Sequence, residues 1–250
     1  MKIQCSAVAV AVAACAVLAS CGGSSADDAA KPPAGAVTYP QVAPTVGSLD
    51  TFANVTVDEL GNSIARGYEE RVTKSGSDGS YELSQDDPTA QSITVNGVLY
   101  RYDPTVRDFG GSNTNYAESK SVTTPPDGTA TTTCNYQGGG HPRPLFVGQS
   151  WSTSYTVSCD GGTVTTYTNT GGVDAVESIT VAAGTFTALR THDTITWTTH
   201  DGEVVVETVQ AWIDPAHSFF TLKNVTTYTR TGIVPTHYVV SSTTELQSRQ

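Results

Sequence analysis

The sequence predicts an all-β, mainly antiparallel protein, and three observations lead to this prediction. Turn dipeptides recur between segments that favour β-structure, apolar and polar residues alternate with a period of two between these turns, and a single segment tolerates a helix. The expected architecture is a strongly curved sheet, either a half-open barrel or a sandwich, with at most one short helix.

Five dipeptides supply the positive φ angles that tight hairpin turns demand. Each lies between two segments that favour β-structure, so we expect several antiparallel hairpins to follow one another along the chain. The dipeptides are Asp78-Gly79, Asn96-Gly97, Asp160-Gly161, Gly171-Gly172 and Asp201-Gly202.

The clearest alternation runs from Trp151 to Ser158. Trp151, Thr153, Tyr155 and Val157 fall on one face of the expected strand, and the serines and the threonine between them fall on the other. One face of this sheet should therefore contact water.

A second strand is expected from Leu189 to Trp197, in which every second residue shares a face. Phe186 is out of phase with that face. This mismatch predicts a bulge or bend just after Gly184, and hence a curved sheet.

Two regions depart from the strand pattern. Glycine and proline clusters between Arg107 and Pro144 predict long loops. The segment from Val57 to Tyr68 allows a turn or two of helix, which its two glycines keep short.

The N-terminal segment predicts an exported, lipid-modified protein. An apolar run from Ala7 to Ala19 follows Lys2 and is too short to span a bilayer comfortably. It ends in Leu18-Ala19-Ser20-Cys21, the arrangement of a bacterial lipoprotein signal in which Cys21 carries the lipid. We expect residues 1–20 to be removed and acyl chains such as palmitate on Cys21 to anchor the protein to a membrane. An ordinary secretory signal with an incidental cysteine is the alternative.

Residues 21–47 are rich in Gly, Ser, Ala, Asp and Pro, a composition that predicts a flexible, lipidated stalk. The stalk should hold a single antiparallel β domain, residues 48–250, away from the membrane. Gly22, rather than an aspartate, follows Cys21. The expected location is the bacterial cell envelope, and in a host with two membranes this glycine favours the outer membrane, facing the periplasm.

The charge of the mature chain disfavours two classes of partner. Removal of the signal takes away Lys2 and leaves 12 basic and 24 acidic residues, a formal net charge of 12 − 24 = −12. Nucleic acid and anionic lipid both require clustered Lys and Arg, so we expect neither to bind the folded domain. The lipid anchor is the expected link to the membrane.

Cys134 and Cys159 remain after the signal is removed and Cys21 is modified. In an oxidising envelope they should form a disulfide, and closing a loop of about 25 residues stabilises the fold by about 3.5 kcal/mol in the loop-entropy model. Neither cysteine has a second Cys or a His at ligand spacing, so no metal site is expected.

Three segments form an ordered string over about residues 145–230. They are Val147-Gly148-Gln149-Ser150-Trp151, then VAAGTFTAL at residues 181–189, then Trp212-Ile213-Asp214-Pro215, followed by Lys223. The string resembles that of uncharacterised bacterial periplasmic and lipoprotein β-domains, whose form is V-G-x-x-W, V-x-A-G-T-F-x-A-L and W-x-x-P-x-x-G-x-V-K. The resemblance implies an antiparallel, curled sheet and carries no assigned activity. The chain departs from it at Ala216-His217-Ser218-Phe219-Phe220, where the family has a glycine-containing turn.

Common catalytic motifs do not occur in the sequence. It has no G-x-S-x-G, no H-E-x-x-H, no phosphate-binding glycine loop and no C-x-x-C. We therefore expect neither enzymatic activity nor a cofactor. Asp214 and His217 are the nominees for an acid/base pair, although a turn carboxylate beside a surface histidine explains them more simply.

Two main functions remain open. Trp151, Phe186, Trp197 and Trp212 lie in the expected strands and would line a groove for a hydrophobic ligand or an extended apolar segment, unless they fill the core. The alternative is a structural or assembly lipoprotein that contacts another envelope protein through loops or a sheet edge. A hydrolase whose site is assembled from distant residues is a third possibility.

Overall fold

The computed structural model describes residues 31–88, 93–95, 98–100, 103–112, 115–125, 130–218, 220–232 and 238–250. Strands dominate these residues, and none of them is helical. No helix within the described ranges is long and apolar enough to span a membrane. The strands are β1 Leu49–Asp58, β2 Ser63–Ser75, β3 Tyr81–Asp86, β4 Ile93–Val95, β5 Val98–Tyr100, β6 Thr105–Ser112, β7 Asn115–Thr123, β8 Thr132–Gly138, β9 His141–Pro142, β10 Ser150–Cys159, β11 Val164–Val181, β12 Gly184–Thr198, β13 Val204–Asp214, β14 Phe220–Thr231 and β15 Val239–Arg249.

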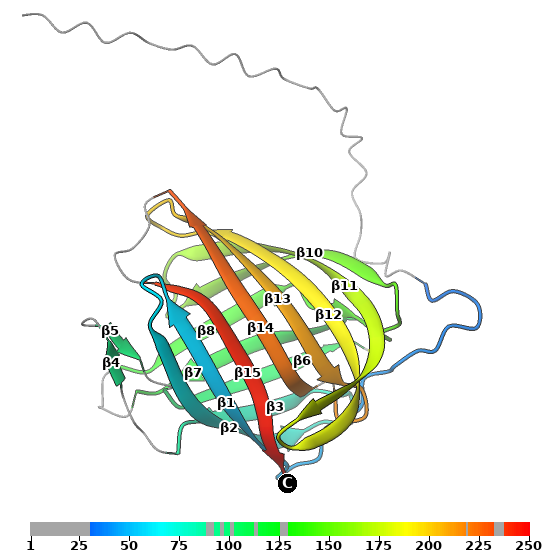
Figure 1. Ribbon diagram of the computed structural model, residues 1–250. Coiled ribbons are helices and arrows are strands. Elements are labelled where there is room, and N and C mark those ends of the chain that lie inside the picture. The colour runs from blue at the N-terminus through cyan, green and yellow to red at the C-terminus, as the bar shows by residue number, and fades with distance from the viewer. Residues whose placement is uncertain are drawn as a thin grey trace, which may run out of the picture.

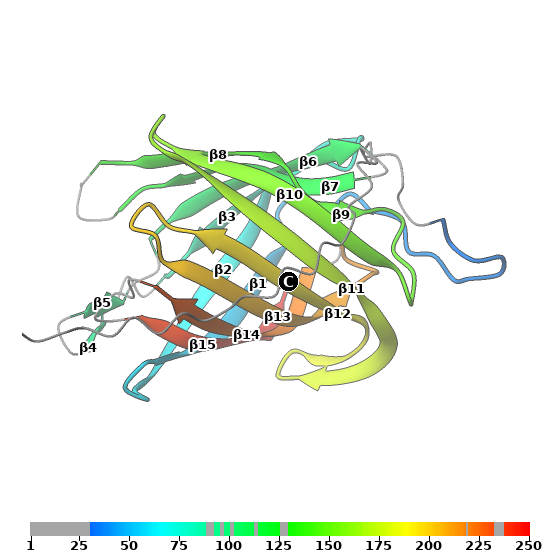
Figure 2. The same cartoon turned by 90° about the horizontal axis from the view of Figure 1, so that it is seen from above.

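The main sheet has 13 strands, and all except β9 form one closed antiparallel barrel (Figures 1 and 2). Successive strands are hydrogen-bonded neighbours around the ring, β6 pairs with β7, and β15 returns to pair with β1. The short strand β9 pairs with β7, while β4 and β5 form a separate hairpin. The all-β, antiparallel prediction is confirmed, and the curved sheet closes completely.

Three of the predicted turns connect neighbouring barrel strands. Asp78-Gly79 joins β2 to β3, Asp160-Gly161 joins β10 to β11, and Asp201-Gly202 joins β12 to β13. The glycine of each pair has a positive φ, as does Asp160, which is the geometry that hairpin turns require. Asn96-Gly97 lies outside the described residues.

The turn predicted at Gly171-Gly172 is wrong, because both glycines lie inside β11. Gly171 is paired with Trp151 on one side and Asp193 on the other. A Cβ atom on Gly171 would lie 2.3 Å from the backbone oxygen of His192 and 2.7 Å from Nε1 of Trp151. The glycine therefore serves close packing between neighbouring strands and not chain reversal.

The long loops predicted between Arg107 and Pro144 are also wrong. These residues form most of β6, all of β7 and β8, and the short β9. Barrel closure gives these strands hydrogen-bonding partners along the ring, and paired backbone groups stabilise strands even where glycines interrupt the apolar pattern.

The segment from Val57 to Tyr68 is a hairpin and not a short helix. Oδ1 of Asp58 accepts hydrogen bonds from the backbone nitrogens of Leu60, at 3.0 Å, and Asn62, at 2.7 Å. Aspartate stabilises turns in this way, and the turn leads directly into β2.

The core consists of three clusters of buried hydrophobic residues. The Phe52 cluster contains Phe52, Val181, Ala188, Leu222 and Leu246; the Leu145 cluster contains Leu145, Trp151, Val173 and Leu189; and the Tyr81 cluster contains Val72, Tyr81, Leu83 and Tyr116. Trp151 is buried between the exposed Ser150 and Ser152, as the alternation predicts.

The curvature of β11 and β12 arises away from the predicted position. Their hairpin reverses between Val181 and Gly184, while the register shifts between Val173 and Ala175. Beyond the shift, Phe186 packs against the Phe52 cluster. A bulge in β11 therefore reorients the hairpin end.

The predicted disulfide is confirmed. Cys134 on β8 and Cys159 on β10 are directly opposite each other and are bonded. It joins β8, which lies in the region that was expected to form loops, to β10, the strand that contains Trp151. The lipidation site, Cys21, lies outside the described residues.

Residues 39–48 lie against the barrel, and we call them the N-terminal strap (blue in Figure 1). All of them except residue 48 fall in the segment that the composition predicts to be a flexible stalk. Tyr39 and Leu145 exchange backbone hydrogen bonds of 2.8 and 2.9 Å, and Tyr39 packs against the Leu145 cluster. Such contacts cannot be predicted from local composition, because Leu145 is about 100 positions away from Tyr39 in the sequence.

Candidate functional site

A cavity of about 370 Å³ is lined by residues of β3, β6 to β12 and segments between strands, and one lining residue, Arg143, contacts Gln41 of the N-terminal strap. This volume is within the range of roughly 300–1,000 Å³ that is typical of small-molecule sites. Strands that are far apart around the ring, such as β3 and β12, contribute to its wall. Its aromatic lining residues are Tyr81, Phe109, Tyr116, Tyr136 and Tyr155, and its charged or amide-bearing ones are Arg107, Glu118, His141, Arg143 and Asn169.

The aromatic rings give the cavity flat apolar surfaces. Tyr81 stacks on Phe109 with ring centroids 4.9 Å apart, and on Tyr116 at 5.6 Å. On β10, Tyr155 stacks on Tyr167 at 4.9 Å. Stacked aromatic faces of this kind suit a ligand that carries a ring.

Arg107 and Glu118 form an ion pair in the cavity wall. Nε of Arg107 donates to Oε1 of Glu118 at 3.1 Å, and Nη2 donates to Oε2 at 2.6 Å. This two-bond geometry is the strongest arrangement between these groups. Burial raises the pKa of the neighbouring Glu70 carboxyl, and the charge of Arg107 opposes that rise.

Arg143 is a buried cation in the same wall, with 6% of its surface exposed. Its Nε donates to Oε1 of Gln41 in the strap at 3.1 Å, and its guanidinium lies 5.6 Å from the ring centroid of Tyr116. Burial lowers the pKa of Arg143 to about 10, which leaves it charged at pH 7. The interaction of a charge with a polar ligand is stronger in such a dry environment than in water.

The tyrosine hydroxyls of the cavity are neutral at pH 7. Burial raises the pKa of Tyr81 to about 12 and also raises that of Tyr116, Tyr136 and Tyr155. A neutral phenol can both donate and accept a hydrogen bond. These groups can therefore bind polar atoms of a ligand without adding charge.

Asn169 on β11 presents an unpartnered acceptor to the cavity. The residue is 7% exposed, and its Oδ1 has no hydrogen-bond partner among the described residues. Leaving a buried polar atom unpaired costs about 1–3 kcal/mol. The position is therefore suited to an O–H or N–H donor that enters the cavity.

A run of three glycines shapes the cavity between β8 and β9. Gly138, Gly139 and Gly140 have φ angles of 85°, 70° and 91°, which other residues rarely adopt. A Cβ atom on Gly139 would lie 2.9 Å from Cβ of Tyr155. The glycines therefore let the chain pass close to this ring.

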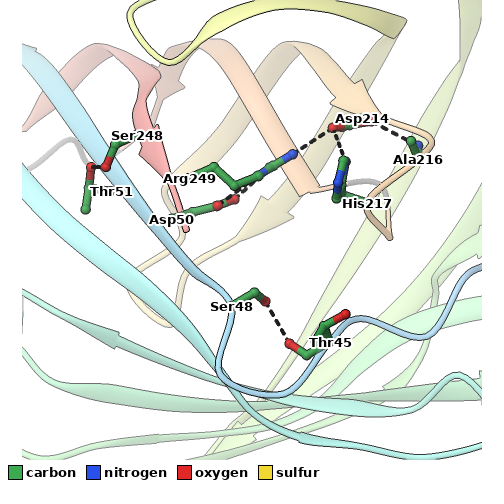
Figure 3. Close-up of polar contacts among 9 residues, drawn as sticks. All are labelled: Thr45, Ser48, Asp50, Thr51, Asp214, Ala216, His217, Ser248 and Arg249. Carbon is green, nitrogen blue, oxygen red and sulfur yellow. Dashed lines mark hydrogen bonds and ion pairs between the residues drawn. The ribbon is translucent and has the colours of Figure 1, made fainter.

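A second polar cluster lies between the strap and the end of β13 (Figure 3). Nδ1 of His217 and Nη1 of Arg249 both lie 2.7 Å from Oδ2 of the buried Asp214. Arg249 also donates to both carboxylate oxygens of Asp50, at 2.8 and 2.7 Å. A smaller cavity of about 120 Å³ adjoins these residues.

The structure thus places the predicted pair, Asp214 and His217, in contact with each other. The other partners of Asp214 are groups that stabilise the fold. Asp214 also accepts a hydrogen bond from the backbone nitrogen of Ala216 at 2.9 Å, which stabilises the turn. The serines that line the smaller cavity, Ser48 and Ser218, donate to backbone oxygens (Figure 3 shows Ser48). In the described residues, we find no hydrogen bond between a serine and His217 of the kind that activates a nucleophile.

The four aromatic residues proposed from the sequence lie in packed regions. Trp151 belongs to the Leu145 cluster and donates from Nε1 to Asp193 at 2.8 Å. Phe186 and Trp212 pack against the Phe52 cluster, and Trp197 lies 5.2 Å from the ring of Tyr167. None of the four lines the 370 Å³ cavity.

Most residues of the cavity wall could not be identified from the sequence, for a specific reason. Arg107, Glu118 and Arg143 fall in the region that was expected to form loops. The alternation from Trp151 to Ser158 predicts the apolar face of this strand for Tyr155, and it is the one signal in the sequence for a residue of the cavity wall. Within the described part of the chain, no group of three or more His, Cys, Asp or Glu side chains could hold a metal ion.

No protein-family model matches the sequence, and no curated protein is detectably similar to it. The resemblance based on the three-segment string therefore stays a prediction. Two solved structures are similar to this chain. One, from Bacteroides fragilis NCTC 9343, is described as an exported protein with a YmcC-like fold; it has a TM-score of 0.50, is 11% identical, and the match covers 86% of this chain and 99% of that chain.

The other, from Parabacteroides distasonis ATCC 8503, is described as a lipoprotein; its TM-score is 0.46, its identity 13%, and the match covers 85% of this chain and 97% of that chain. At 11% identity, the likeness to the Bacteroides fragilis protein concerns the fold alone. The barrel described above is thus similar to a YmcC-like fold.

Proposed function

We propose that this protein is a lipid-anchored protein of the bacterial cell envelope whose barrel binds one small amphipathic ligand. The ring of the ligand lies against the tyrosines of the 370 Å³ cavity, and its polar atoms meet the buried amide of Asn169. The observation that carries the proposal is this cavity, which the side chains of the described residues leave unfilled. The proposed role is binding, without catalysis.

Three observations support the envelope location. The chain has the signal pattern that ends at Cys21, and its Cys134–Cys159 disulfide is typical of an oxidising compartment. The similar protein from Bacteroides fragilis is described as exported. Attachment of palmitate and location in the outer membrane are part of the proposal.

The contacts of the N-terminal strap relate the cavity to the proposed anchor. Tyr39 is 18 residues from Cys21 (39 − 21), and a flexible chain of that length has an r.m.s. reach of roughly 23 Å. Gln41 of the strap contacts Arg143 of the cavity. We therefore expect the strap, and with it Arg143 of the cavity wall, to lie roughly 23 Å from the lipid anchor on average.

The first test measures binding of a neutral ring probe. Full-length protein in detergent is titrated with 2-naphthamide by isothermal titration calorimetry, and we expect saturable binding with one site per chain. Ala117→Phe adds a ring to a residue that lines the cavity and should abolish this binding. Val55→Phe adds the same ring at an exposed position of β1 and should not. The heat that remains in the titration of the Ala117→Phe protein gives the contribution from partition of the probe into detergent.

Native mass spectrometry of the protein purified under mild conditions provides the complementary test. A small molecule retained by the unaltered protein and lost from Ala117→Phe would support the proposal. If neither 2-naphthamide nor 2-naphthoate binds in a saturable manner and no ligand is retained, the barrel does not bind ligands of this class.

The alternative function is contact with another envelope protein. The arrangement of the strands favours contact through a free strand side. Closure of the barrel leaves β9 and the β4–β5 hairpin as the strands with a free side among those described. Exposed strand sides can pair with a partner. Photocrosslinking probes at Thr94 and at His141 in cells should then capture one reproducible partner, and probes at Thr199 should not.

A further inference from the structure

Among the lining residues of the cavity, arginines outnumber carboxylates, whereas the whole protein is acidic. The chain has a formal net charge of −11, yet the cavity wall contains two arginines, Arg107 and Arg143, and one carboxylate, Glu118. Glu118 is bound to Arg107 through two hydrogen bonds. The charge balance of these three residues is therefore positive.

The position of Arg143 suits recognition of an anion. Its Nε is oriented by Gln41, and its guanidinium lies against the ring of Tyr116, so the side chain is held in place before a ligand arrives. A guanidinium presents its N–H groups in a planar fork that matches the two oxygens of a carboxylate. Holding the cation rigidly reduces the entropy lost on binding.

The groups around Arg143 would complete such a site. Tyr81 and Tyr116, which line the cavity and influence the electrostatics of Arg143, are neutral phenols that can donate to an oxyanion. His141 lies at a more exposed position, with its Nε2 3.5 Å from Asp193. Because the guanidinium of Arg143 lies 5.6 Å from the ring centroid of Tyr116, a ligand ring that contacts Tyr116 can carry its acidic substituent to Arg143.

We propose that the ligand of the cavity carries a carboxylate or a similar oxyanion on its ring system, and that Arg143 binds this group. This inference rests on the proposed ligand-binding function and names the chemical class of the ligand. The unpartnered Oδ1 of Asn169 adds a second requirement, an O–H or N–H donor elsewhere on the ligand. The predicted class is therefore a cyclic acid that also bears a hydroxyl or amino group.

The test compares two probes of nearly the same shape. 2-Naphthoate carries a carboxylate, and 2-naphthamide replaces it with a neutral amide. Calorimetric titration of the full-length protein should give an affinity for 2-naphthoate at least tenfold higher than for 2-naphthamide. An affinity ratio near or below one in the unaltered protein overturns the inference, while leaving the proposed binding function intact. Binding of neither probe counts against the proposed function itself.

Variants of Arg143 then test the residue. Arg143→Gln should reduce the ratio of the two affinities to about one, mainly by weakening binding of 2-naphthoate. Arg71→Gln removes the same charge from an exposed position of β2 and should leave the ratio unchanged. Circular dichroism and thermal unfolding check that the variants fold. If Arg143→Gln does not fold, Arg143→Lys keeps the charge without the planar fork and should lower the ratio several-fold; an unchanged ratio in a folded variant contradicts the assignment.

Discussion

Nδ1 of His217 lies 2.7 Å from Oδ2 of Asp214, and this carboxylate also binds Arg249. Through the bonds of Arg249 to Asp50, the network links the end of β13 to β15 and β1 (Figure 3). The pairing of β1 with β15 joins the N-terminal and C-terminal strands of the barrel. The acid/base pair nominated from the sequence therefore belongs to a network that stabilises barrel closure.

Arg249→Met should destabilise the protein by about 3–5 kcal/mol, because it leaves the carboxylates of Asp50 and Asp214 buried without their cation. The side chains of these two aspartates are 5% and 4% exposed. Urea unfolding at pH 7 measures the change. Arg71→Met, at an exposed position, should change stability by less than about 0.5 kcal/mol. A loss below about 1 kcal/mol for Arg249→Met would contradict the role given to this network.

His217→Ala should have a much smaller effect on stability. The histidine side chain is 57% exposed, and exposed ion pairs contribute about 0–1 kcal/mol. Asp214 keeps its bonds to Arg249 and to the backbone of Ala216 in this variant. The same urea experiment tests this prediction, and a loss similar to that of Arg249→Met would show that His217 is a central member of the network.

Gly171→Ala should destabilise the protein by about 1–3 kcal/mol, the usual effect of overpacking. The new Cβ would lie 2.3 Å from the backbone oxygen of His192, so β11 and β12 would have to separate. Gly67→Ala in β2 is the matched control, because its Cβ would be 3.5 Å from the nearest atom, an ordinary contact. Thermal unfolding compares the two variants, and equal effects would indicate that close packing at Gly171 is unimportant.

Replacing Cys134 and Cys159 together by alanine should reduce stability by about 3–4 kcal/mol, according to the loop-entropy model. The bonded pair closes a loop with a sequence separation of 25 residues. Urea unfolding with and without a reducing agent measures the effect. The reductant should destabilise the unaltered protein and leave the double variant unchanged; equal sensitivity of both proteins would contradict the prediction.

Glu207→Gln should flatten the dependence of stability on pH. Burial raises the pKa of Glu207 above its ordinary value of 4.5, and the hydrogen bond from Tyr228 opposes this rise. The folded state therefore binds the proton more tightly than the unfolded state. The stability contributed by the protonated form is fully present below pH 4.5 and is lost as the pH rises through the folded-state pKa.

Thermal unfolding between pH 4 and pH 8 tests this effect, and the amide variant should gain stability relative to the unaltered protein toward the upper end. Asp201→Asn in an exposed turn is the control and should follow the unaltered protein. Parallel pH curves for the Glu207→Gln and unaltered proteins would show that this carboxyl does not couple protonation to folding.

The sequence predicts those features that depend on neighbouring residues. The Asp160-Gly161 turn follows from the backbone preferences of two residues, and the buried face of β10 follows from alternation around Trp151. The disulfide between Cys134 and Cys159 follows from the cysteine count and the expected compartment. These arguments together were enough for the all-β, antiparallel fold class.

Only the tertiary structure decided where the cavity lies and which residues line it. Tyr81 and Asn169 are 88 positions apart (169 − 81) and share one wall because the sheet closes into a ring. Gly171 has the sequence appearance of a turn residue, yet it lies in a strand because β10 and β12 pair with it on both sides, at Trp151 and Asp193. The sequence by itself determined the strands and several of their turns, since these depend on local backbone preferences. The pairing of β6 with β7 and of β15 with β1 determined the site, because long-range closure sets which side chains meet.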